Sequence, residues 1–150
     1  MAGSGNYGRV RARRCAVQAL YQWQLAGQEP NEILREFVAE RELVKVDMEY
    51  FSTLTREIPR HFETLRADLE LALDREWTKL GPVERGVLLV GAYELRFCPH
   101  VPWRVVVNEA VELCKLFGAE DAHKFVNGVL DRTARAVRPT ETGSQATPAA

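Results

Sequence analysis

Four arginines stand close together near the start of the chain: Arg9, Arg11, Arg13 and Arg14. The stretch that holds them, RVRARRCAVQALYQWQ (residues 9–24), contains no acidic residue, and none precedes Glu29. If a helix begins here, positive charges at its start oppose the helix dipole and are unfavourable. Guanidinium groups, however, bind phosphate through paired hydrogen bonds. The arginines therefore indicate contact with a polyanion that supplies the missing negative charge.

On a helical wheel, one arc of this first helix is polar and lies opposite an arc rich in alanine and leucine. The polar arc consists of Arg11, Arg14, Gln18, Tyr21 and Gln22. Amides can read base edges and a tyrosine ring can stack on an unpaired base, so the arc is typical of RNA contact. The alternative is an ordinary solvated face, but such faces mix both signs of charge and this one holds no carboxylate.

A second group of polar and aromatic residues lies in FGAEDAHKFVNGVLDR, residues 117–132, where a glycine breaks two helices apart. Asp121 comes close to a helix start, where a carboxylate interacts well with free N–H groups, so it is interpreted first as a cap or first-turn acid. Phe117 and Phe125 are by type more often core residues. Lys124 is expected to face outward, away from the apolar positions of the same helix.

Composition excludes several classes of protein. The chain has 150 residues, the usual size of one domain, and a net charge of only -1, so any nucleic-acid site must be a local basic patch. Three widely spaced cysteines form no metal-binding pattern, and no phosphate-binding loop occurs. His61, His100 and His123 have no evident catalytic partners. We therefore expect no enzyme, no metal and no cofactor.

No membrane segment is expected either, because no apolar run approaches the roughly 18 residues of a membrane span. The start of the chain lacks the apolar core of a secretory signal, and the cysteines are interpreted as buried thiols in a reducing compartment. These features predict a cytoplasmic protein.

Apolar periodicity predicts an all-α fold. Helices are expected over about residues 10–26 and onward from Asn31, Asp47, Pro82, Pro102 and about Glu120. Pro59 should kink or break the third, and the one conceivable strand is the β-prone segment RVVV, residues 104–107. Gly128 lies inside the last helix, where glycine is unfavourable, and is interpreted as the site of a helix crossing. Residues 1–8 and 139–150 read as a flexible N-terminal tail and a disordered C-terminal tail.

Three motifs resemble the NusB family of bacterial transcription antitermination factors, in the family's order and spacing. They are RRCAVQALYQWQL, ERGVLLVGAYEL and VVVNEAVELCKLFGAEDAHKFVNGVLDR, within a resemblance that covers residues 9–138. The resemblance implies two small helical bundles packed into one domain, without catalysis or cofactor. It implies binding to the boxA element of ribosomal RNA leader transcripts together with NusE, a small-subunit ribosomal protein. The pair would join other Nus factors on RNA polymerase and promote read-through of terminators.

The resemblance also implies roles for individual residues. RNA contacts on the first helix are expected from Arg11, Arg13 and Arg14, assisted by Gln18. Tyr21 would lie where RNA and the protein partner meet, and Glu84 would offer its carboxylate to a basic residue of the NusE-like partner. The RNA surface would be extended by Phe117, Asp121, Lys124 and Phe125.

Two alternatives remain open. One is a helical adaptor that binds proteins and has no RNA duty of its own. The same domain also resembles the N-terminal part of some ribosomal RNA cytosine methyltransferases, in which a long catalytic region follows. A chain that ends at Ala150 is expected to lack that region. Self-association into a homodimer, which would mask the basic face, is a further possibility that the sequence leaves undecided.

Overall fold

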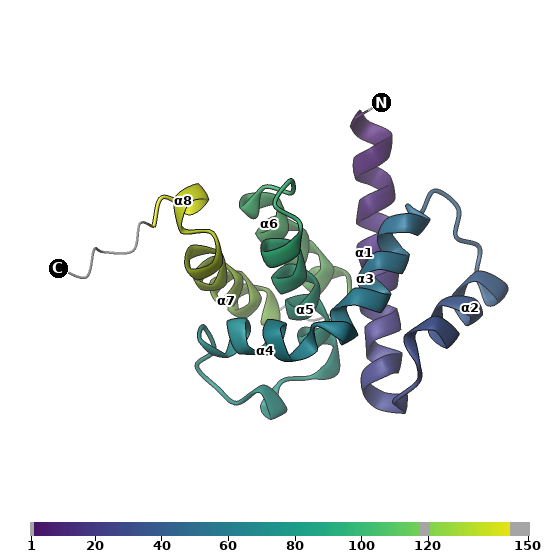
Figure 1. Cartoon of the computed structure of the whole chain (residues 1–150), viewed down its shortest axis with the longest axis horizontal. Helices are drawn as coiled ribbons and strands as arrows, with labels where there is room; N and C mark the ends of the chain where they lie inside the picture. Colours follow the sequence, from purple (N-terminus) through teal and green to yellow (C-terminus); the bar gives the residue numbers. More distant parts are fainter. Residues whose placement is uncertain (1, 118–120, 145–150) are drawn as a thin grey trace. The chain divides into compact units, whose positions relative to one another are not determined.

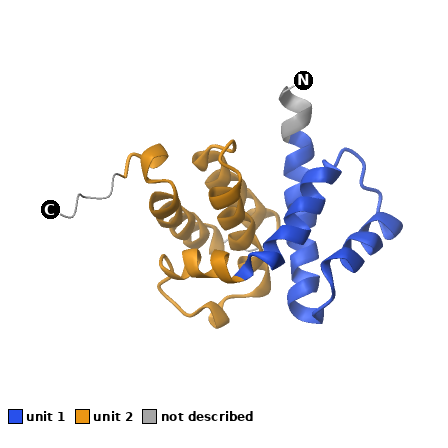
Figure 2. Ribbon diagram, viewed as in Figure 1, with its two compact units in different colours: residues 1–62 blue, residues 63–150 orange. Residues whose placement is uncertain are grey.

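The structure is a computed structural model that describes residues 2–117 and 121–144, with side chains from residue 7 onward. The chain divides into two compact units, residues 1–62 and residues 63–150 (Figure 2). Every regular element in the described part of the chain is a helix, so the prediction of an all-α fold is confirmed. The segment RVVV lies in a helix, because burial of Val106 and Val107 outweighs the β preference of the branched side chains.

Unit 1 is built from α1 (Ala2–Ala26), α2 (Pro30–Glu40) and α3 (Met48–Arg60), and α1 packs against both of the others (Figure 1). Alanines at 12, 16 and 19 are fully buried on α1. They let the backbones of the neighbouring helices come close. Larger side chains fill the space between, and the rings of Phe37 and Phe51 lie 5.4 Å apart.

The ends of these helices follow local chemistry. Gly27 adopts a positive φ of 64° after the end of α1, as expected for a glycine stop. The Asp47 carboxylate caps α3 by accepting a hydrogen bond of 3.0 Å from the Tyr50 N–H. The helix ends soon after Pro59, as predicted. The expected cap at Asn31 is wrong, because α2 begins one residue earlier at Pro30, whose fixed φ suits a first helical position.

Unit 2 contains α4 from Glu63 onward (the helix spans Phe62–Glu70), the 3-10 turn η1 (Trp77–Lys79), α5 (Pro82–Phe97), α6 (Trp103–Leu116), α7 (Ala122–Val137) and α8 (Pro139–Thr142). Helix α5 packs against both α6 and α7, and all its residues from Gly86 to Leu95 are buried. This confirms the prediction that α5 forms the buried centre. The expected start near Glu120 lies outside the described residues.

Glycine permits a close approach at one point in this unit, and it is not the point that the sequence suggested. A Cβ atom at Gly91 would lie 2.7 Å from Leu130 Cδ1, so α5 and α7 pack closely here. A Cβ atom at Gly128 would meet only the Arg132 side chain, 3.3 Å away on the same helix. The interpretation of Gly128 as a helix crossing is therefore wrong, because its free side is occupied by a guanidinium and not by a neighbouring helix.

Both ends of the described chain include helical residues. Helix α1 already begins at Ala2, and α8 continues the fold into residues 139–142. At the C-terminal end, Arg138 holds the chain just before α8. Its buried guanidinium donates hydrogen bonds to four backbone carbonyls at the end of α5 and in the loop that follows it. These belong to Glu94, Leu95, Cys98 and Val101. Residues 145–150 of the predicted tail lie outside the described residues.

The described residues contain neither a membrane-spanning helix nor a cluster of metal ligands. None of their helices combines the length and the apolar character that crossing a membrane requires. Nor do they hold three or more histidine, cysteine or carboxylate side chains grouped as metal ligands.

Candidate nucleic-acid interface

The α1 surface, defined here as Arg11, Arg14, Gln18 and Tyr21, lies along one side of the first helix. Arg14 is exposed, and Arg11 is half-buried with its guanidinium 4.9 Å from the centroid of the Tyr7 ring. The Nε atom of Arg11 is buried and has no hydrogen-bond partner among the described residues. A buried donor without an acceptor is unfavourable. The unpaired Nε atom of Arg11 therefore suits a site in which a bound ligand supplies the acceptor.

Arg13, which the family resemblance places in the RNA site, lies on the packed side of α1. Its side chain is only 4% exposed, and its guanidinium carbon lies 5.7 Å from the centroid of the Tyr50 ring. Arg9 lies over the same ring at 4.9 Å and forms a long ion pair of 4.0 Å with Asp47. In this structure Arg13 therefore packs within unit 1, separate from the α1 surface, and its RNA contact stays a prediction.

Arg41 joins the α1 surface from the residue after α2. Its guanidinium donates to the Gln18 side-chain oxygen and lies over the Phe37 ring, 4.1 Å from the centroid. Burial raises the pKa of the nearby Cys15 thiol, while Arg41, Arg11 and Arg14 act in the opposite direction. Sequence reasoning missed Arg41 because only the packing of α1 against α2 brings it to Gln18.

Further along α1 the character of the surface changes. The Tyr21 ring is 43% exposed, which fits a stacking or partner-binding role. Gln22, in contrast, donates to the Glu36 carboxylate at 3.0 Å, and Gln28 donates to the same group at 2.8 Å. The fold therefore brings a carboxylate to the end of an arc that has none in its own sequence. The basic part of the surface is confined to the first half of the arc.

The α7 surface, defined here as Phe117, Asp121, Lys124 and Phe125, surrounds the start of α7. Asp121 and Lys124 are exposed, and both phenylalanines are half-buried. Asp121 stands at the N-cap position but has helical backbone angles, and its side chain makes no capping hydrogen bond within the described residues. The interpretation as a cap is therefore unsupported. The two rings are not pure core residues, because each retains accessible surface.

An arginine that the sequence did not single out covers one of these rings. The Arg75 guanidinium carbon lies 4.1 Å from the centroid of the Phe125 ring, and Arg75 also pairs with Asp74 at 3.1 Å. Arg75 belongs to the segment between α4 and η1, far from α7 in sequence. No local pattern links the two residues, so only the folded chain reveals the pair.

Glu84, the predicted contact for a protein partner, lies in the first turn of α5. One of its carboxylate oxygens accepts a hydrogen bond of 3.3 Å from the Gly81 N–H, which caps the helix. Burial raises the pKa of Cys114 to about 11, with a smaller contribution from the Glu84 carboxylate. Glu84 is half-buried, so it caps the helix and its carboxylate is still partly accessible to a partner.

Comparison with known proteins assigns the chain to a family. The family model described as the NusB family matches residues 10–135. The chain belongs to the NusB family. It is 47% identical to the transcription antitermination protein NusB of Idiomarina loihiensis over 88% of this chain and 95% of that protein. It is 48% identical to the protein of the same name from Alcanivorax borkumensis, over 89% of each chain.

A solved NusB-family assembly is similar in structure as well. A chain in the crystal structure of the antitermination factors NusB and NusE in complex with dsRNA is 36% identical and superposes with a TM-score of 0.73. The match covers 85% of this chain and 96% of that one. The family resemblance expected from the three sequence motifs is thereby confirmed over nearly the same residues.

One of the three histidines lies in an ion pair on a helix surface. His61 lies 3.6 Å from the Glu57 carboxylate one turn before it on α3, an ordinary pair on the surface of a helix. A catalytic pair would need a nucleophile within hydrogen-bond reach of the base. The names of the relatives describe transcription factors, which agrees with a binding protein rather than an enzyme.

Proposed function

We propose that this protein is a transcription antitermination factor that binds boxA RNA of ribosomal RNA leader transcripts together with a NusE-like ribosomal protein. The pair promotes read-through by RNA polymerase, in contact with other Nus factors. The relatives named transcription antitermination protein NusB, and the related complex of NusB, NusE and dsRNA, support this function. The proposal places the protein in the cytoplasm, where bacterial transcripts are made.

The observation that carries the RNA role is that Arg11 and Arg14 have no carboxylate partner within the described part of the chain. The structure records no ion pair for either residue within the described part of the chain. Arg11 has in addition a buried donor without an acceptor. Helix α1 begins at Ala2, so both residues lie beyond its first turns, where the helix dipole no longer acts, and their guanidinium groups themselves attract an anion. RNA phosphates supply that anion.

The remaining contacts are proposed residue by residue. Gln18 and Tyr21 continue the α1 surface, with Tyr21 also touching the protein partner, and Glu84 offers its carboxylate to a basic residue of that partner. Further RNA contacts come from the α7 surface defined above. Arg13 is also a proposed RNA contact. It is buried in this structure, so RNA would have to draw it away from Tyr50.

The test is the affinity of a fluorescently labelled boxA RNA, measured by anisotropy at several salt concentrations with and without the NusE-like protein. We expect salt-sensitive binding that tightens with the partner and weakens for a scrambled RNA. The double reversal Arg11→Glu/Arg14→Glu should make the plot of log K against log salt shallower by about 1.4, because each phosphate neutralised on a single strand contributes about 0.7.

A matched control separates a local contact from net charge. Arg35→Glu/Arg56→Glu makes the same change of charge at exposed positions on α2 and α3 of the same unit. RNA affinity should be largely kept in this control. If both double reversals weaken binding equally, the α1 surface is not the RNA site. If boxA RNA does not bind in any condition while the NusE-like protein does, the adaptor function replaces the proposed one.

A further inference from the structure

Arg75 and Phe125 form a stacked pair at the edge of the α7 surface. The guanidinium carbon lies 4.1 Å from the ring centroid, within the range of a cation–π contact. The Arg75 side chain remains 48% exposed, so about half of it is accessible while its guanidinium covers the ring. The ion pair with Asp74 is also exposed, and such pairs are weak and easily exchanged for a stronger anion.

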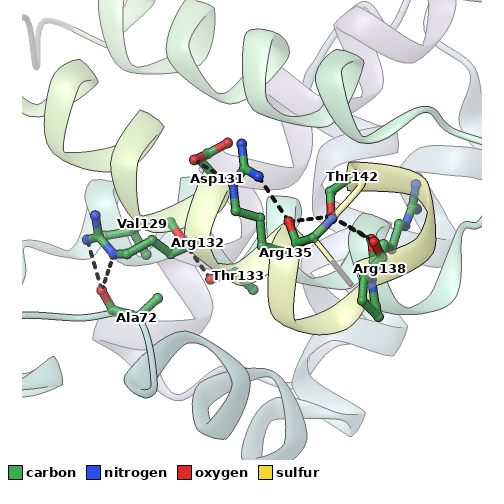
Figure 3. Close-up of polar contacts among 10 residues, drawn as sticks. Ala72, Val129, Asp131, Arg132, Thr133, Arg135, Arg138 and Thr142 are labelled. Carbon is green, nitrogen blue, oxygen red and sulfur yellow. Dashed lines mark hydrogen bonds and ion pairs between the residues drawn. The ribbon is translucent and has the colours of Figure 1, made fainter. Parts of the chain in front are cut away.

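The segment that carries Arg75 is tied to α7 by a second arginine. Arg132 donates two hydrogen bonds to the backbone oxygen of Ala72, from Nε at 3.1 Å and from Nη2 at 2.9 Å (Figure 3). Ala72 itself is buried, and its N–H donates to the Leu69 oxygen at 2.9 Å. The backbone three residues before Arg75 is thereby held against the helix that carries Phe125.

Gly128 belongs to the same arrangement. It lies one turn before Arg132 on α7, and a Cβ atom there would stand 3.3 Å from the Arg132 Nη1 atom. A side chain at this position would need the Arg132 guanidinium to shift by a few tenths of an ångström. The Arg132 guanidinium therefore lies beside the open side of this glycine.

We propose that Arg75 is an RNA-binding residue, whose guanidinium, stacked on Phe125, offers its outer face to an unpaired base and its N–H groups to a phosphate. Arg132 acts as a positioning residue for it. This inference rests on the proposed RNA-binding function and adds to it a residue and a mode of contact. Arginine suits both tasks, because its planar group stacks and also binds phosphate.

A different role for the pair is a cover, in which Arg75 must leave before a base can stack on Phe125. The tether at Ala72 argues against it, since the backbone beneath Arg75 is held in place by Arg132. The two roles predict opposite results. Removal of a cover strengthens RNA binding, whereas removal of a stacking residue weakens it.

The test compares boxA RNA binding by the wild-type chain, Arg75→Ala, Arg75→Lys and a control, Arg104→Ala. We expect Arg75→Ala to weaken binding about fivefold to tenfold, the lower part of the range for loss of one stacked base. Its salt slope should fall by about 0.7. Arg75→Lys should keep the slope but not the full affinity, because an ammonium group has no planar face.

Arg104 is a matched control because it also stacks on an aromatic ring, that of Trp103, at 4.9 Å. It lies at the start of α6, near the end of α7, where Arg135 reaches the same ring at 5.8 Å. The Trp103 ring therefore lies near the Arg135 end of α7, and Phe125 is near the other end. Arg104→Ala should leave RNA affinity unchanged.

The positioning role of Arg132 is tested by Arg132→Gln alone and combined with Arg75→Ala. We expect the single change to weaken RNA binding and to have no further effect when Arg75 is already alanine, since coupled residues are not additive. Thermal melting of each variant shows whether the fold is kept. Equal losses in both backgrounds would overturn the positioning role, because a purely structural effect does not depend on Arg75.

Each outcome decides between the two proposals. If the wild-type chain does not bind boxA RNA, the proposed function fails. If it binds and Arg75→Ala binds equally well or more tightly, the function stands and Arg75 is not an RNA contact. If Arg75→Lys equals wild type, the contribution is charge alone and the stacked contact with a base is overturned.

Discussion

Three arginines of unit 1 and three of unit 2 have different surroundings, and the difference separates binding from structure. In unit 1, Arg9, Arg11 and Arg41 contact side chains: a carboxylate, aromatic rings and an amide. In unit 2, Arg132 and Arg138 donate to backbone carbonyls. Arg85 does the same at the oxygens of Trp77 and Thr78. An arginine bound to several carbonyls holds loops and helix ends together, whereas one that contacts exposed side chains can exchange them for a ligand.

The carbonyl-bound group in unit 2 should have the largest effect on stability. Arg138→Ala leaves buried carbonyls at the end of α5 without donors, and we expect a loss of about 3–5 kcal/mol in the free energy of unfolding. The measurement is chemical denaturation. The control is Arg14→Ala on the exposed side of α1, which should change stability by less than about 0.5 kcal/mol. Equal effects would remove the distinction between the two groups.

Tyr21 tests the opposite side of the comparison, a residue expected to bind and not to stabilise. Tyr21→Ala should weaken binding of boxA RNA by about 1–3 kcal/mol if the ring stacks on a base. Because the ring is 43% exposed, the melting temperature should hardly change. The measurement is RNA anisotropy beside a thermal melt. A large drop in melting temperature with unchanged affinity would show that Tyr21 is a packing residue.

Arg13 and Arg14 are neighbours in sequence but differ in burial, so together they sharpen the comparison within one unit. We expect Arg13→Ala to lower stability by about 1 kcal/mol, because the side chain is buried, and, as a proposed RNA contact, to make the salt slope of RNA binding shallower by about 0.7. Arg14→Ala should keep stability and make the salt slope shallower by about 0.7. An unchanged slope for Arg13→Ala would mean that Arg13 stays packed against Tyr50 and is not an RNA contact.

The smallest expected effect is on the pH dependence of folding stability, and it comes from Glu141. The Trp103 N–H donates to its carboxylate at 2.8 Å and lowers its pKa, with a further contribution from Arg138. A carboxyl whose pKa is lowered by folding stabilises the fold above its ordinary pKa near 4.5, and this contribution is lost as the pH falls through the lowered value. Glu141→Gln should therefore narrow the stability difference between pH 7 and pH 3. An unchanged difference would show that the contact contributes nothing.

Local sequence signals succeeded where the structure depends on neighbours in the chain. The proline starts, the cap at Asp47 and the break near Pro59 follow from backbone geometry that each residue imposes by itself. The family motifs likewise located both candidate surfaces. Arg41 and Arg75 were missed, because each reaches its surface from a segment far away in sequence.

The sequence by itself determined that the chain is helical, where most helices begin and end, and that α1 carries unmatched positive charge. These properties depend on periodicity, backbone preference and charge, all of which are local. Only the tertiary structure decided that Arg13 is buried beside Arg14, that Arg138 closes the end of α5, and that Arg132 holds the backbone at Ala72. Such outcomes depend on which segments pack together, since burial and hydrogen-bond partners arise from neighbours in space.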